Sequence, residues 1–259
     1  MRSIFPRSWM ASFSGLLVLL TIVTSVLAQD LGILLDQSAY DGAERRVIYS
    51  SKLTFTRDVA SLFTTKQLYA LTSLAFTQME SKHRAQGIEQ RLQPNMMVAM
   101  ALGHDVYLSS SLKGGRFMYN DWGADSKPQI RLALDRCQAR LQASRNAPVS
   151  QIHKARAGCG EYYMDDDVSV EARKWPPPTR VVAFGRGNVP NEAPTPQNVC
   201  GKSESLDSEG FITWGCYHLM ADEGIDAPQR PGKYPKLSLP DPFPEFTKKQ
   251  ISIIPRARP

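Results

Sequence analysis

The chain lacks several sequence signatures of common enzymes, and each absence narrows its function. It contains no Gly-x-Ser-x-Gly segment, so the nucleophile elbow of α/β-hydrolases is excluded. It has no glycine-rich loop of the P-loop or dinucleotide-binding type, which argues against those two modes of nucleotide binding. No internal repeat is visible, so repeat architectures are excluded as well.

Cysteine and histidine are both rare, with four residues of each in the 259-residue chain. The four cysteines are Cys137, Cys159, Cys200 and Cys216. An even number of cysteines in a secreted protein is interpreted first as a set of disulfides, which here would be two. Zinc binding is the alternative for the same residues, because thiolate sulfur is a common zinc ligand.

Residues 1–28 have the pattern of a secretory signal peptide. Arg2 and Arg7 precede an apolar run, and the run ends in small residues at Ala28. No later stretch approaches the length of a membrane span. We therefore expect cleavage after Ala28, a secreted protein that begins at Gln29, and no transmembrane segment.

Charge is nearly balanced once this segment is removed. Taking Arg2 and Arg7 from the 31 basic residues leaves 29, against 25 acidic residues. This mild excess permits an anionic partner but does not require one. There is no Asn-x-Ser/Thr site, so no ordinary N-glycan is expected.

The first clear secondary-structure signal is a helix start. Thr64 and Gln67 have the spacing of a capping box, and apolar residues then recur at helical spacing. The pattern predicts a helix over about residues 65–82, whereas residues 30–62 are left without assignment. Further along, the apolar run 96–102 and the alternating run 106–111 flank a break around His104, which favours a hairpin of two strands.

The second half of the chain alternates between helix and strand signals. A helix is predicted from about residue 126, a second helix begins within 156–164, and 179–185 is a short apolar strand. The helix from about 126 carries an apolar stripe of Ile130, Leu134, Cys137 and Leu141. A third helix over 214–224 ends at Gly224, and Ile225 begins another short strand.

These elements predict an α/β sandwich of two or three layers, with a mixed central sheet flanked by helices. We expect one domain over residues 29–226, with its core in about 92–226. Residues 227–259 contain 8 prolines, which predicts an extended, partly disordered Pro-rich tail.

Three of the cysteines can be combined with a carboxylate into a hydrolytic zinc site. Three protein ligands leave one position on zinc for water, whose pKa falls to near 7. A carboxylate beside that water can relay protons to a departing amine. Cys159, Cys200 and Cys216 are the candidate metal ligands, and Glu161 is the candidate catalytic proton relay.

The segment "AGCGE", the strand "VVAFG" and the two later cysteines together resemble the cytidine deaminase-like superfamily. That family combines a His-or-Cys-x-Glu motif with a later Pro-Cys-x-x-Cys motif. Here Val199 precedes Cys200 where the family has proline, and 15 residues separate Cys200 from Cys216 where the family has two. The resemblance covers about residues 92–226. It implies a zinc cofactor and hydrolysis of an exocyclic amine on a base, nucleoside or related heterocycle.

Other interpretations of the same residues stay open. Two disulfides, Cys200 with Cys216 and Cys137 with Cys159, would give a stapled, non-catalytic secreted protein. A deaminase-like fold could also carry a Cys200–Cys216 bridge and no metal. His153 or His218 could replace one cysteine as a ligand, although a lone histidine is more often an ordinary residue.

The sequence thus leads to two functional hypotheses. The first is a secreted zinc-dependent deaminase-like hydrolase that acts as a toxin or effector, on a small base or nucleoside or on single-stranded nucleic acid. The second is a disulfide-stapled effector or interaction protein that binds a host target. Toxin or effector action rests on analogy with the family.

Overall fold

The structure is a computed structural model. It describes residues 29–42, 45–114, 129–151, 153–154, 158–160, 178–187, 192–200, 205–232 and 235–251. The predicted signal peptide lies outside these ranges. The chain divides after Leu31, and all elements below belong to the unit Gly32–Pro259. A search of the described helices found none that combines the length and the apolar character needed to cross a membrane.

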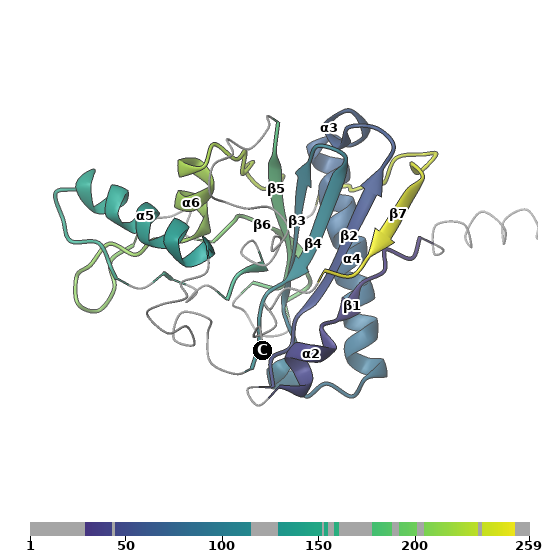
Figure 1. Ribbon diagram of the computed structural model, residues 1–259, viewed down its shortest axis with the longest axis horizontal. Coiled ribbons are helices and arrows are strands. Elements are labelled where there is room, and N and C mark those ends of the chain that lie inside the picture. Colours follow the sequence, from purple (N-terminus) through teal and green to yellow (C-terminus); the bar gives the residue numbers. More distant parts are fainter. Residues whose placement is uncertain are drawn as a thin grey trace, which may run out of the picture. The chain divides into compact units, whose positions relative to one another are not determined.

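The described residues form a seven-stranded antiparallel sheet (Figure 1). Its strands are β1 (Leu34–Leu35), β2 (Tyr49–Phe55), β3 (Met96–Leu102), β4 (Asp105–Ser110), β5 (Arg180–Gly185), β6 (Thr195–Gln197) and β7 (Phe246–Lys249). The spatial order is β1-β2-β4-β3-β5-β6, and β7 pairs with β2 beside β1. The architecture is therefore α/β with an open sheet.

The prediction of a mixed sheet is wrong for these seven strands, because every pair of them is antiparallel. A short strand was expected to begin at Ile225, after the third predicted helix. Asp226 does pair in parallel with Arg180, but only as an isolated bridge. One bridged residue pair is too short to extend the sheet, which explains the difference.

The predicted hairpin is confirmed as β3 and β4. Leu102 faces Asp105 at its closed end, and Met97 faces Ser110 at its open end. The two-residue turn consists of Gly103 and His104. Gly103 has φ +55, which glycine adopts at little cost.

One face of the sheet is covered by α4 (Thr65–Ala85), which begins at the predicted capping box and runs three residues past the predicted end. The Thr64 hydroxyl accepts from Gln67 N at 3.3 Å, and the Gln67 side chain accepts from Thr64 N at 2.9 Å. The helix packs on β3 and β5, where the rings of Phe76 and Phe184 lie 5.9 Å apart.

The other face belongs to a hydrophobic cluster that includes α5 (Gln129–Ala143) and α6 (Cys216–Asp222). Val98 and Met100 of β3 belong to this cluster. Leu134, Cys137 and Leu141 are buried there, which confirms three positions of the predicted apolar stripe. The sheet thus lies between α4 and this cluster.

Two regions contribute structure that the sequence patterns did not reveal. The segment before α4, which the sequence left unassigned, forms β1, α2 (Gln37–Asp41), β2 and α3 (Val59–Leu62). A short 3-10 helix, η1 (Gln90–Leu92), follows α4. The Pro-rich segment contributes β7, which holds a place in the sheet against β2. Phe246 of β7 packs on Phe55 with ring centroids 5.7 Å apart.

A buried histidine on α4 makes the stability of the protein depend on pH. The His83 ring packs on Tyr49 with centroids 5.0 Å apart, and within the described part of the chain its Nε2 has no hydrogen-bond partner. Burial is the largest cause that lowers the pKa of His83 to about 4, and the nearby positive charges of Arg84 and Arg186 contribute to the same shift.

We expect the protein to lose stability as the pH falls from 6.5 toward 4. In this window the unfolded chain protonates His83 and the folded protein does not, so protonation favours unfolding by up to about 3 kcal/mol. Chemical denaturation at several pH values measures the slope. A His83→Phe variant should show a flatter slope, and an unchanged slope in this variant would contradict the assignment.

Candidate metal centre

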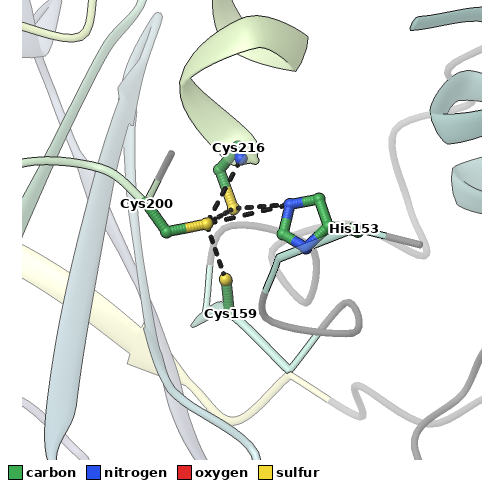
Figure 2. A group of neighbouring side chains, drawn as sticks. All are labelled: His153, Cys159, Cys200 and Cys216. Atoms are coloured by element: carbon green, nitrogen blue, oxygen red, sulfur yellow. Dashed lines mark hydrogen bonds between the residues drawn. The ribbon is translucent and has the colours of Figure 1, made fainter. Parts of the chain in front are cut away.

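Three cysteines and one histidine direct their ligand atoms toward one another (Figure 2). The ligand atoms of His153, Cys159, Cys200 and Cys216 all lie within 4.8 Å of one another. Cys200 Sγ is 3.0 Å from Cys159 Sγ and 3.0 Å from Cys216 Sγ. His153 Nε2 lies 3.7 Å from Cys200 Sγ and 3.6 Å from Cys216 Sγ. These four residues are called the His/Cys centre below.

His153 is fixed in place by a neighbouring tryptophan. The indole Nε1 of Trp214 donates to the Ser150 carbonyl at 2.8 Å, and Lys154 N donates to the Trp214 carbonyl at 2.8 Å. The rings of His153 and Trp214 meet edge to face with centroids 5.2 Å apart. Trp214 is wholly buried, so the segment around His153 is anchored on both sides of the imidazole.

Cys159 is held against the end of β4 by its two glycine neighbours. The Gly158 carbonyl accepts from Leu112 N at 3.0 Å. Gly160 lies so close to the strand that a Cβ there would stand 2.6 Å from the Ser109 carbonyl oxygen. Only glycine permits this approach, and it positions the Cys159 sulfur beside the other ligands.

Cys200 and Cys216 are connected through the start of α6. Cys216 is the first residue of the helix, and its N–H donates to Cys200 Sγ at 3.3 Å. The next residue, Tyr217, donates its N–H to the Cys200 carbonyl at 2.9 Å. The loop containing Cys200 is therefore hydrogen-bonded to the first turn of α6.

Cys200 and Cys216 differ in their tendency to ionise. Hydrogen bonding with Cys159 and Cys216 holds the pKa of Cys200 well below its usual value. Burial raises the pKa of Cys216 well above its usual value. Cys200 therefore loses its proton more readily than Cys216 does. Because zinc-bound sulfur is thiolate, metal binding releases the remaining thiol protons and weakens as the pH falls.

Cys137 lies apart from the centre, on α5. It is 2% exposed within the hydrophobic cluster, and burial raises its pKa to about 12. A thiol in such surroundings is unreactive and behaves as a small apolar side chain. Cys137 therefore provides a matched control for substitutions at the other three cysteines.

The donor set of the His/Cys centre could hold a metal such as zinc. Zn–S bonds of about 2.3 Å and Zn–N bonds of about 2.0 Å give tetrahedral edges of about 3.8 Å between sulfurs and about 3.5 Å between sulfur and nitrogen. The His153 distances of 3.6 and 3.7 Å lie within about 0.2 Å of the second value. The sulfur pairs at 3.0 Å need to separate by about 0.8 Å to surround the ion.

The structure brings together all three cysteines that were named as ligands from the sequence. It adds His153 as a fourth possible ligand. From the sequence His153 was considered only as a replacement for one cysteine, because a lone histidine more often has no metal-binding role. The spacing of six residues between His153 and Cys159 was the available signal. The other histidine considered, His218, accepts a hydrogen bond from Gly215 N through Nδ1 at 3.3 Å. Glu161, the predicted catalytic residue, lies outside the described residues.

The disulfide interpretation has a different outcome for each pair. None of the four cysteines, all of which the structure describes, is part of a disulfide. Cys159 lies with Cys200 and Cys216 instead of forming the predicted bridge with Cys137. Cys200 and Cys216 are neighbours, but their 3.0 Å separation exceeds a disulfide bond of about 2.05 Å.

Comparisons of the chain with protein-family profiles, with curated proteins and with solved structures found no match. The fold and the centre together define an α/β protein with an open antiparallel sheet and a possible His/Cys metal site.

Proposed function

We propose that the protein binds one zinc ion through His153, Cys159, Cys200 and Cys216, and that this ion holds its functional fold together. The observation that carries the proposal is the convergence of four zinc-preferring donors from distant parts of the chain. Zinc sites with four protein ligands are closed and structural, whereas catalytic sites keep one position open.

The four donors come from four separate segments of the fold. Cys159 is fixed to the end of β4, Cys216 begins α6, and Cys200 lies in the loop after β6. A zinc ion shared by these segments would clamp the loops and α6 against the sheet. In a small extracellular protein such a clamp takes the place of disulfides.

The protein is proposed to act outside the cell that makes it, because residues 1–28 have the signal-peptide pattern. We propose a zinc-stabilised effector or interaction protein, with residues 29–226 as the folded domain and β7 as a C-terminal addition to its sheet. A target on another organism fits this interpretation. It is an expectation from the secretion signal, and binding assays on candidate host extracts would test it.

A second candidate is hydrolytic deamination, with Glu161 as proton relay. Two observations favour it: Glu161 directly follows Cys159 and Gly160, and the order of helix, hairpin, Cys-x-Glu, strand and cysteine-led helix resembles the deaminase-like family. Zinc would supply the activation of water there, provided that His153 leaves one position free. The fourth ligand of the ion separates the two candidates: nitrogen from His153 supports the structural role, and oxygen supports hydrolysis.

The zinc content of purified variants tests the proposal. Protein prepared without chelators should contain about one zinc ion per chain, and Cys159→Ser or Cys216→Ser should abolish this stoichiometry. Cys137→Ser is the matched control and should keep its zinc, because Cys137 lies outside the centre. Equal zinc in all variants, or its absence from the unmodified protein, would refute the proposal.

A further inference from the structure

We propose that Cys200 is the oxidation site of the centre, where a single disulfide to Cys159 or Cys216 replaces the metal. Oxidation would then switch the centre between a zinc-bound form and a bridged, zinc-free form. The metal side of this inference rests on the proposed function, whereas the choice of Cys200 rests on the geometry of the sulfurs alone.

Cys200 is in close contact with both other sulfurs of the centre, and all the ligand atoms lie within 4.8 Å of one another. Its Sγ lies 3.0 Å from Cys159 Sγ and 3.0 Å from Cys216 Sγ, and it contacts His153 as well (Figure 2). A disulfide bond of about 2.05 Å requires either pair to approach by only about 1 Å. Since three sulfurs can form just one bridge, one of the outer two stays a thiol.

Cys200 also has the largest exposed fraction of the three cysteines in the centre. Cys216 is 0% exposed and Cys159 is 8% exposed, whereas Cys200 is only partly buried. An oxidant that arrives from solvent therefore meets Cys200 first. Exposure and position therefore favour the same residue. Cys200 is the cysteine that reacts first with the oxidant, and it has two neighbouring sulfurs that can complete a bridge.

The reaction proposed is thiol–disulfide exchange with a small-molecule disulfide such as oxidised glutathione. The Cys200 thiolate attacks one sulfur of the oxidant, which forms a mixed disulfide and releases one small thiolate. The thiolate of Cys159 or Cys216 then attacks the Cys200 sulfur and releases the second small thiolate. Two protein cysteines lose two electrons, and one small disulfide gains them and becomes two thiols.

This exchange and zinc binding exclude each other. The proposed ion needs three thiolates, and the bridge removes two of them. Zinc should therefore protect the centre from oxidation, and a bridged centre should bind no zinc until it is reduced. For a protein exported to an oxidising environment, the metal would determine which form persists.

Peptide mapping tests the inference. Metal-free, reduced full-length protein is treated with oxidised glutathione below its unfolding temperature, remaining thiols are alkylated, and bridges are located without reductant. The expected bridges are Cys159–Cys200 or Cys200–Cys216. Cys159→Ser should keep only the second, Cys216→Ser only the first, and Cys200→Ser should retain its thiols over the same period.

Cys137→Ser is the control and should bridge as the unmodified protein does. Protein unfolded in urea is a second control, because bridges to Cys137 should appear once the fold no longer separates it from the other three. A dominant Cys159–Cys216 bridge in folded protein, a bridge to Cys137, or undiminished bridging in Cys200→Ser would overturn the inference. The absence of any bridge would overturn it as well.

A zinc-loaded arm separates this inference from the proposed function. Zinc-loaded protein should bridge more slowly and should release zinc in step with bridging. A chain that binds no zinc but bridges through Cys200 would contradict the proposed function and support the inference. A chain that binds zinc but never bridges through Cys200 would support the proposed function and overturn this inference.

Discussion

Removal of zinc by a strong chelator is expected to lower the thermal unfolding midpoint by about 10 °C or more. A ligand present at 1,000 times its dissociation constant stabilises the fold by about 4 kcal/mol, and each kcal/mol shifts the midpoint by about 2–4 °C in a chain of this size. The loss should be largest around α6 and the Cys200 loop, because two of the four proposed ligands hold these segments in place. Circular dichroism during heating measures the midpoint.

The chelation experiment has an internal control. Cys216→Ser should melt at the same low temperature with and without the chelator, because the variant has no complete centre to lose. Cys137→Ser should respond to the chelator as the unmodified protein does. Zinc should restore the midpoint of chelated protein, whereas magnesium should not, since its preferred ligands are oxygen atoms. A midpoint that is indifferent to the chelator would contradict a structural role for the ion.

Gly160→Ala is expected to damage the centre without touching any ligand atom. The added Cβ would stand 2.6 Å from the Ser109 carbonyl oxygen and 3.1 Å from the Ser110 carbonyl oxygen. Both atoms belong to β4, which is paired on each side and cannot move away. The segment of Cys159 must shift instead, at a cost of about 1–3 kcal/mol in stability and with weaker zinc binding.

Gly42→Ala is the matched control for this substitution. Gly42 has φ −66, and a Cβ there would meet its nearest atom, the Ser38 carbonyl oxygen, at an ordinary 3.4 Å. This variant should therefore stay within about 0.5 kcal/mol of the unmodified protein and keep its zinc affinity. Denaturant unfolding and competition with a zinc indicator measure the two effects. A Gly160→Ala protein that matches this control in both would show that the close approach is not required.

The sequence predicted the elements whose patterns are local. The capping box at Thr64 and Gln67 places α4, and the break around His104 places the hairpin. In contrast, β2 was missed because Ser50 and Ser51 are fully buried inside it, so its polar residues do not alternate with apolar ones. β7 was missed because it lies among prolines and is stabilised by pairing with a strand about 200 positions away.

The centre could be predicted only in part for a similar reason. Cysteine is rare enough in this chain that three sulfurs and a metal formed a specific hypothesis from sequence alone. His153 carries no such signal, because its role depends on the packing of Trp214 and on the position of Cys216 in space. The sequence likewise could not show that the segment at Asp226 fails to become a strand of the sheet. That outcome depends on tertiary contacts, because Asp226 pairs with β5 only at Arg180.

X-ray absorption at the zinc edge, on protein purified without chelators, tests the central claim most directly. A closed His/Cys centre predicts three sulfur neighbours at about 2.3 Å and one nitrogen at about 2.0 Å, and His153→Ala should replace that nitrogen by oxygen. Fewer than three sulfur neighbours, or a spectrum unchanged in His153→Ala, would contradict the proposed ligand set.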